Sequence, residues 1–207
     1  MKRIYQRDLP HIQPPGSTIF ITFRLAGSLP KSKIIEIKSD FERLAKIIKS
    51  NTLNKEQTVN EQFLLIQKFD KYLHASVSGH HFLKEPKIAK LICDTIHFHD
   101  GILYQLFAYC IMPNHVHLVL KPNPIDDENE ILLEKIMHSL KSYTATEANK
   151  ILQRKGQFWM HESFDHYIRS QESYERIIKY VMDNPVKANL VKKSSDWPWS
   201  FKWHNHP

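Results

Sequence analysis

The sequence has little cysteine and no long apolar run. Its two cysteines, Cys93 and Cys110, lie inside apolar helical and strand patterns and show neither metal-site nor disulfide-framework spacing. We therefore expect buried thiols in a reducing cytoplasm. No apolar run approaches the roughly 20 residues that span a bilayer. The charged residues 1–8 precede no apolar core of the kind that a secretory signal requires.

Internal repeats and low-complexity tracts are also missing, so the length of 207 residues suits one domain. An apolar fraction of 42% and an aromatic fraction of 11% are typical of a globular protein. Within a single domain, 1–207, we expect an irregular arm at residues 1–16 because prolines punctuate it. Residues 51–81 are expected to be a helical insertion, and residues 187–207 a basic, aromatic tail.

The net charge is positive. There are 29 lysines and arginines against 22 acidic residues, which gives +7 at neutral pH. Such a bias favours an anionic partner, nucleic acid among them, although a basic surface that serves only solubility explains the charge equally well.

The most informative stretch is Pro-Asn-His-Val-His-Leu-Val-Leu at residues 113–120. Its β-branched, apolar character predicts a buried strand. Side chains alternate faces along a strand, so His115 and His117 share one face while Val116 and Leu118 pack the other. Two neutral imidazoles side by side on a rigid element are a favourable beginning for a divalent-metal site.

The rest of the sequence alternates between segments with the two-residue period of a strand and segments with the roughly 3.6-residue period of a helix. Further strands are predicted at 17–25, 102–111 and 164–168, and helices at 31–50, 63–73, 86–97, 131–152 and 170–184. Ser170 is the expected N-cap of the last helix, and Pro185 is expected to end it. This order predicts an α+β sandwich with an antiparallel sheet and helices packed on one face.

The last helix carries a second pair of chemical groups. Tyr180 and Asn184 are one turn apart and share a face. A tyrosine phenol can act as a nucleophile, and an amide oxygen suits a hard divalent cation. Taken alone, however, this spacing fits a core tyrosine and a helix-end asparagine better than catalysis.

Together, these residues resemble a known family. The His-Val-His motif is similar to that of the HUH endonucleases. The order and spacing of Phe158-Trp159, Asp165, Ile168-Arg169 and the run 180–188 resemble the REP-associated tyrosine transposases. These belong to the single-tyrosine insertion-sequence transposases of prokaryotes. The resemblance extends over about residues 17–200 and implies a ferredoxin-like, RRM-like sheet with the histidine pair on a central strand.

The resemblance also implies a chemistry. Tyr180 would attack a phosphodiester of single-stranded DNA, which gives a 5′-phosphotyrosine link and a free 3′-hydroxyl, and strands would later be rejoined. His115 and His117 would hold Mg²⁺ or Mn²⁺. Asn184 stands where insertion-sequence relatives commonly have a glutamine ligand, so its shorter side chain is a departure at the third ligand position.

The partner implied by the resemblance is single-stranded DNA folded into a palindromic hairpin. Four basic residues are candidates to contact it, namely Arg24, Lys141, Arg169 and Lys187. A solvated surface role is as good a reading for Arg24 and Lys141. Relatives act as monomers or as homodimers, and the sequence leaves both open.

Two other functions remain possible at this point. A phosphodiesterase that uses water activated at the histidine pair would cleave without a covalent intermediate. A domesticated, catalytically inactive protein would bind DNA hairpins without cleaving them. The histidine pair, the tyrosine and Asn184, all present together, favour the enzyme.

Overall fold

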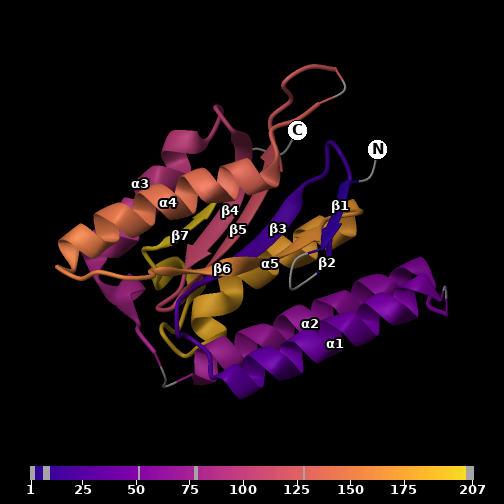
Figure 1. The fold of residues 1–207 in the computed structure, drawn as a ribbon, viewed down its shortest axis with the longest axis horizontal. Helices are drawn as coiled ribbons and strands as arrows, with labels where there is room; N and C mark the ends of the chain where they lie inside the picture. Colours follow the sequence, from indigo (N-terminus) through magenta and orange to yellow (C-terminus); the bar gives the residue numbers. More distant parts are fainter. Residues whose placement is uncertain (1–2, 7–9, 51, 77–78, 128, 204–207) are drawn as a thin grey trace.

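The fold is built on a five-stranded antiparallel sheet in which most neighbouring strands are not consecutive in the chain. Five α-helices of the described residues surround it (Figure 1). The computed structural model describes residues 3–6, 10–50, 52–76, 79–127 and 129–203. The elements run in the order β1 (Arg3–Gln6), β2 (Pro10–Gln13), β3 (Ile19–Leu25), α1 (Lys31–Lys49), α2 (Lys55–Ala75), η1 (Phe82–Lys84), α3 (Pro86–His99), β4 (Tyr104–Ile111), β5 (His115–Pro122), α4 (Leu133–Ile151), β6 (Trp159–Tyr167), α5 (Gln171–Lys187), η2 (Ser194–Asp196) and β7 (Ser200–Lys202).

The main sheet has the strand order β6-β3-β5-β4-β7, and each neighbouring pair is antiparallel. The strand with the histidine pair, β5, is therefore the central one, as the sequence predicted. In the register, Thr22 of β3 lies opposite His117 and Arg24 lies opposite His115. The predicted α+β class and antiparallel sheet are confirmed.

Helices cover both faces of this sheet, so the expectation that they pack on one face is wrong. The first face packs against α3 and α4, and the second against α1, α2 and α5. The reason lies in the strands, which are apolar on both sides. In β3, for example, Ile21 belongs to the first core and Phe20 to the second. An apolar face left open to water would forfeit the free energy of burial, so each face recruits its own helices.

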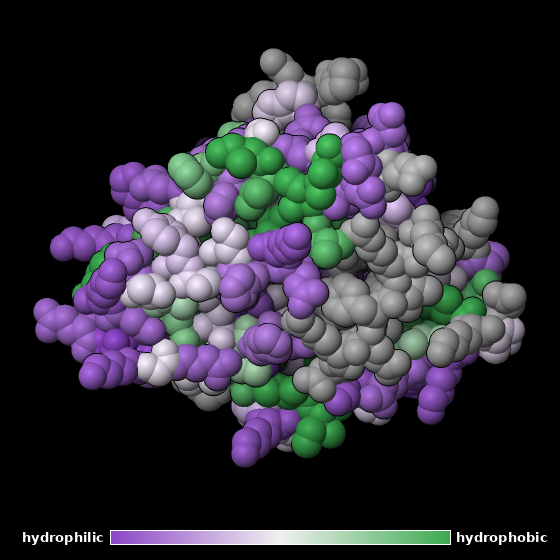
Figure 2. Space-filling model, turned by 45° about the horizontal axis from the view of Figure 1, so that its top comes forward, coloured by the Kyte–Doolittle hydropathy of each residue, from purple (hydrophilic) through white to green (hydrophobic). Residues whose placement is uncertain are grey.

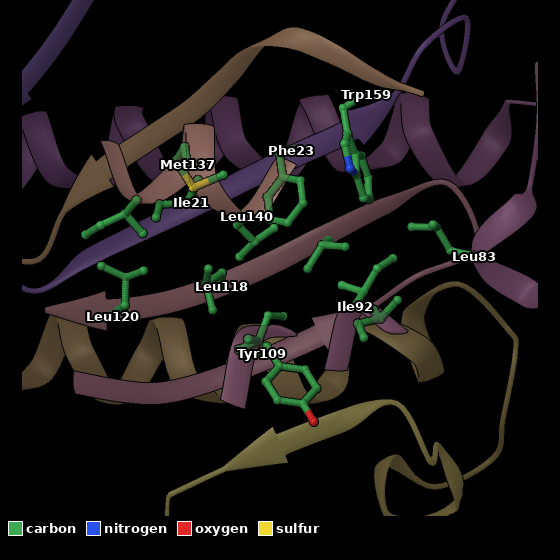
Figure 3. Close-up of a cluster of buried hydrophobic side chains, with 14 of the residues drawn as sticks. Ile21, Phe23, Leu83, Ile92, Tyr109, Leu118, Leu120, Met137, Leu140 and Trp159 are labelled. Carbon is green, nitrogen blue, oxygen red and sulfur yellow. The ribbon is translucent and has the colours of Figure 1, made fainter. Parts of the chain in front are cut away.

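The first core interlocks side chains from the sheet and from two helices (Figure 3). Phe23 of β3 and Trp159 of β6 meet with ring centroids 4.9 Å apart. Leu118 of β5 belongs to the same core as Ile92 from α3 and Leu140 from α4. This core covers the face of the sheet opposite to the histidine pair. The face with the histidine pair is covered by the second layer of helices.

Local sequence signals explain several boundaries. Asn54 begins α2 with a capping box, in which its side chain accepts from the Gln57 amide and the Gln57 side chain accepts from the Asn54 amide. Ser170 caps α5 as predicted. The predicted end of α5 before Pro185 is wrong, because the helix continues to Lys187. A proline in the last turn costs little there, since the bonds from Ala188 to Asn184 and from Leu190 to Pro185 close the end.

Other differences concern the ends of the chain and β6. The expected irregular arm at residues 1–16 contains an antiparallel hairpin of β1 and β2, although residues 1–2 and 7–9 lie outside the described part. The expected insertion at 51–81 includes α2, which lies beside α1 (Figure 1). β6 begins at Trp159, earlier than predicted, and the tail adds β7 to the edge of the sheet beside β4.

The surface is largely hydrophilic on the face drawn in Figure 2, where the apolar patches are separated from one another. Large apolar side chains that remain exposed come from several different elements, among them Ile35 of α1, Leu64 of α2 and Phe98 of α3. Among the described helices, none is long and apolar enough to cross a membrane.

Candidate metal and nucleophile site

His115 and His117 are both fully buried on the face of β5 that α2 and α5 cover. Their Nε2 atoms lie 3.1 Å apart. Two ligands that are each roughly 2.1 Å from one ion stand roughly 3 Å apart when the angle between them is near 90–100°. The pair therefore already has the spacing of two ligands on a shared cation.

The opposite nitrogen of each ring has its own partner. His115 Nδ1 lies 2.7 Å from Asn114 Oδ1, while Asn114 Nδ2 donates to the carbonyl of Leu73 on α2. An amide oxygen can only accept, so His115 Nδ1 carries the proton and donates. His117 Nδ1 lies 2.9 Å from Thr22 Oγ1. Such outer partners fix the ring orientation and turn both Nε2 atoms toward the site.

Electrostatics keeps His115 in the form that binds a metal. Burial, followed by the charge of neighbouring His117, holds the pKa of His115 well below its ordinary value. A neutral imidazole offers a lone pair, and Nε2 is the nitrogen left to offer it. The structure thus supports His115 as a nitrogen ligand at neutral pH.

Tyr180 and Asn184 approach the histidines from α5. The ring centroids of Tyr180 and His117 are 6.0 Å apart, and the Tyr180 side chain is only 4% exposed. Burial, together with the charge of Asp70, raises the pKa of the Tyr180 phenol well above its ordinary value. The predicted pairing of these two residues on one helix face therefore places both of them at the histidine site.

The structure adds two residues that the sequence analysis did not single out, Asp70 and His74. Both come from α2, within the segment that was expected to be a helical insertion. Asp70 Oδ2 accepts hydrogen bonds from the Tyr180 hydroxyl and from Asn184 Nδ2, the latter at 3.0 Å. The same oxygen lies 3.1 Å from His117 Nε2. Asp70 is thereby in contact with three of the four residues predicted for the site.

His74 lies one helical turn after Asp70. Its Nε2 is 2.8 Å from Asn184 Oδ1, and its ring lies 5.7 Å from that of His115. Ligand atoms of Asp70, His74 and His115 all fall within 4.8 Å of one another, a spacing that fits a bound metal ion. The signal that could have found these two residues is their separation of four positions on a predicted helix, which gives them one face.

Burial alone would raise the pKa of the Asp70 carboxyl. His117, His115 and the Tyr180 hydroxyl together outweigh burial and hold that pKa below its usual range. Asp70 is therefore an ionised carboxylate at 2% exposure. An anion so deeply buried needs compensation by cationic or hydrogen-bonding partners.

An open pocket of about 450 Å³ leads to this cluster. Asp70, His74 and Tyr180 line it together with two cations, Lys71 and Lys187. Lys187 Nζ lies 4.1 Å from the centroid of the Tyr180 ring, in cation–π contact. A negatively charged group entering the pocket would meet positive charge directly beside the phenol.

The other basic candidates lie elsewhere. Arg24 is buried and donates to Ser28 Oγ. Lys141, on α4, donates to the carbonyls of residues 160 and 161 and to Ser163 Oγ, beside a separate groove of about 430 Å³. Arg169 stacks on the ring of Tyr167 after β6. Of the four, the structure brings only Lys187 to the pocket of Tyr180.

Comparison with known proteins finds a family that is similar to the part of the chain that holds this site. Residues 85–184 match the family described as "Transposase IS200 like", and this segment holds the histidine pair, Tyr180 and Asn184. Over this segment the chain is similar to the IS200-like transposases, which agrees with the resemblance found in its sequence.

Two curated relatives of this chain carry a more specific name. The chain is similar to the REP-associated tyrosine transposase of Escherichia coli K12, with 28% identity over 97 residues, or 47% of this chain and 53% of the relative. A Haemophilus influenzae protein provisionally given the same name is 26% identical over 102 residues, or 47% of this chain and 58% of the relative. The aligned part therefore spans only about half the length of these curated relatives.

A solved structure of a REP-associated tyrosine transposase bound to a REP hairpin is also similar. It has a TM-score of 0.48 and 18% identity, and the match covers 95% of this chain and 80% of the other. This likeness is too remote to assign roles to individual residues.

Proposed function

We propose that this protein is a metal-dependent transposase that cleaves single-stranded hairpin DNA through Tyr180 and rejoins the strands. The observation that carries the proposal is the meeting of Tyr180 with the histidine pair, through Asp70, in one buried cluster. The match of residues 85–184 to the IS200-like transposases supports the reaction class. The REP-associated names of the relatives support a palindromic hairpin as the substrate.

In the proposed reaction, the Tyr180 oxygen bonds to a DNA phosphorus, and the bond from that phosphorus to the 3′ oxygen breaks. The phenolic proton leaves toward Asp70 Oδ2, which already accepts the hydroxyl's hydrogen bond. The departing oxygen takes a proton from water and becomes a 3′-hydroxyl, and Asp70 passes the phenolic proton to that water, so that it ends the step as a carboxylate again. Because the 5′-phosphotyrosine preserves the energy of the broken bond, a 3′-hydroxyl can later attack it and restore the strand.

The residues fit a divalent cation. His115 and His117 present paired Nε2 atoms, and Asn184, whose amide nitrogen donates to Asp70 Oδ2, would offer its amide oxygen to the same ion. A bound Mg²⁺ or Mn²⁺ would polarise the scissile phosphate and offset its developing charge. Lys187, which lies against the Tyr180 ring in the same pocket, would bind that phosphate.

The proposed site is complete within one chain, since β5, α2 and α5 of the same molecule supply all of these groups. This supports cleavage in cis by a monomer. In a dimer that exchanges α5, the same contacts would form between two chains.

One observation favours the second candidate, a hairpin-binding protein without catalysis. The Tyr180 phenol is almost fully buried and is engaged by Asp70, so it must be exposed before it can reach a phosphate. A binding protein would require no such step.

The experiment that separates the two uses hairpin-bearing single-stranded DNA labelled at either the 5′ or the 3′ end. The DNA is incubated with Mn²⁺ and the wild type or Tyr180→Phe, and then run on a denaturing gel. The proposal predicts that the 3′-labelled fragment migrates with the protein, that the 5′-labelled fragment is released, and that Tyr180→Phe gives neither product.

Tyr143 is the matched control, because it is exposed on α4 and away from the pocket. Tyr143→Phe should form the adduct as the wild type does. Release of DNA by Tyr180→Phe without an adduct would move the nucleophile to water. Binding by all variants without cleavage by any of them would favour the non-catalytic protein.

A further inference from the structure

The helix α2 reaches the histidine site from outside the part of the chain that matches the transposase family. That match covers residues 85–184, whereas α2 spans Lys55–Ala75. The family match therefore does not include Asp70, although Asp70 contacts His117, Tyr180 and Asn184.

The two carboxylate oxygens of Asp70 differ in their surroundings. Oδ2 is 3.1 Å from His117 Nε2, the same separation that joins the Nε2 atoms of His117 and His115. Oδ1 is buried and has no hydrogen-bond partner within the described residues. Burying a carboxylate oxygen without a partner is costly, so native structures usually satisfy it with a donor, a water or an ion.

The chemistry of the surrounding ligand atoms explains why a cation would be the partner of the Asp70 carboxylate. Two imidazoles carry no charge when they are neutral, and an amide oxygen carries none either. A carboxylate in the same cluster supplies the negative charge, and the oxygen, that Mg²⁺ and Mn²⁺ prefer. His74, one turn further along α2, brings another ligand atom within 4.8 Å of those of Asp70 and His115.

We propose that Asp70 is a metal ligand, which completes a set of two histidines and one carboxylate with His115 and His117. The helical pair α1–α2 then serves to bring an anionic ligand to a site whose other groups come from β5 and α5. This inference rests on the proposed function, because the ion in question is the one that the transposase reaction would use.

Calorimetric titration of the metal-free, full-length chain with Mn²⁺ alone tests the proposal without DNA. Asp70→Asn keeps the size of the side chain and should weaken Mn²⁺ binding roughly tenfold or more. Loss of a residue that only orients a ligand already lowers metal affinity roughly 10–100-fold, and loss of the ligand itself should cost at least as much. Glu61→Gln is the matched control, because it removes an acid that is exposed on the same helix. It should bind Mn²⁺ as the wild type does.

Tyr180→Phe separates this inference from the proposed function. It abolishes the adduct if the proposed function holds, and it should leave Mn²⁺ binding intact. If the wild type forms the Tyr180 adduct but Asp70→Asn binds Mn²⁺ as tightly as the wild type, the inference is overturned and the proposed function stands. Absence of Mn²⁺ binding by the wild type would overturn the inference as well.

A measurement on the wild type covers the case in which Asp70→Asn fails to fold. Fe²⁺ replaces Mn²⁺, and ascorbate with hydrogen peroxide generates hydroxyl radicals that cut the backbone beside the ion. Cuts near residue 70, in addition to cuts near residues 115–117, support the proposal. Cuts at β5 without any in α2 overturn it.

Discussion

At the residue scale, the two histidines differ in what holds the far side of each ring. Asn114 fixes His115 and is itself tied to α2 through the Leu73 carbonyl, whereas Thr22 of the neighbouring strand fixes His117. Ring orientation at a metal site depends on such partners, so each of them should influence affinity for the ion.

Thr22→Val gives a direct prediction. The substitution keeps the β-branched shape but removes the hydroxyl that lies 2.9 Å from His117 Nδ1. We expect Mn²⁺ affinity to fall roughly tenfold in calorimetry, while Thr22→Ser, which retains the hydroxyl, should bind within a few-fold of the wild type. Equal affinities for the valine and serine variants would show that the hydrogen bond has no role in metal binding.

His166 on β6 supplies a prediction on pH. Burial, with a contribution from Arg169 and Arg176, lowers its pKa to about 3. The folded protein therefore keeps His166 neutral, while the unfolded chain takes up a proton below its ordinary value of 6.5. Its contribution to stability is complete above about pH 6.5 and falls as the pH drops toward 3.

His166→Gln should accordingly flatten the loss of stability between pH 6.5 and 4, by at most about 1.4 kcal/mol per pH unit. Urea unfolding at several pH values measures this slope. The exposed His161 on the same strand is the control, and His161→Gln should leave the slope unchanged. A slope that stays the same in His166→Gln would contradict the account of His166.

Strand alternation alone predicted that His115 and His117 share a face, and helix geometry alone predicted the same of Tyr180 and Asn184. These are local relations, fixed by backbone period. The contact of Asp70 with Tyr180 joins residues 110 positions apart. No periodicity specifies such a contact, because it depends on how α2 packs against α5, so Asp70 could not be predicted from the sequence pattern.

At the scale of the element, α2 depends on a defined start. Asn54 and Gln57 satisfy each other's backbone amides at its N-terminus, and sixteen residues later the helix presents Asp70. The position of a helix along its axis is set partly by its cap, so this local signal contributes to the distant site.

Asn54→Ala should lower the free energy of unfolding by about 1 kcal/mol, the usual cost of losing such a cap. Urea denaturation followed by circular dichroism measures it. Glu61→Ala, in the exposed interior of the same helix, should change stability by less than about 0.5 kcal/mol. Unchanged stability in Asn54→Ala would mean that packing against α1 alone determines where α2 begins.

The elements that the sequence misjudged were decided by tertiary packing. β6 extends back to Trp159 because residues 159–163 pair with the end of β3, across a bulge between Phe23 and Leu25. β7 is only three residues long and gains its place from pairing with β4. In neither case does the local pattern indicate a strand. The continuation of α5 beyond Pro185 likewise depends on the backbone hydrogen bonds that close its last turn.

At the scale of the whole molecule, two layers of helices cover the two faces of the sheet and have different roles. α3 and α4 bury one side of the sheet in an apolar core, and α5 with α1 and α2 covers the side that carries the histidines. The predicted sandwich had only one such layer. The second layer matters for the proposed function, because it brings the proposed nucleophile from one helix and the anionic group from another to the same strand (Figure 1).

The central claim is that Tyr180 becomes covalently joined to DNA at a metal site. The most direct measurement is tandem mass spectrometry of the protein after incubation with hairpin single-stranded DNA and Mn²⁺, followed by nuclease and protease digestion. We expect a nucleotide attached through phosphate to Tyr180, and none when the metal is chelated. A nucleotide on a different residue, or an adduct that forms equally well without metal, would contradict it.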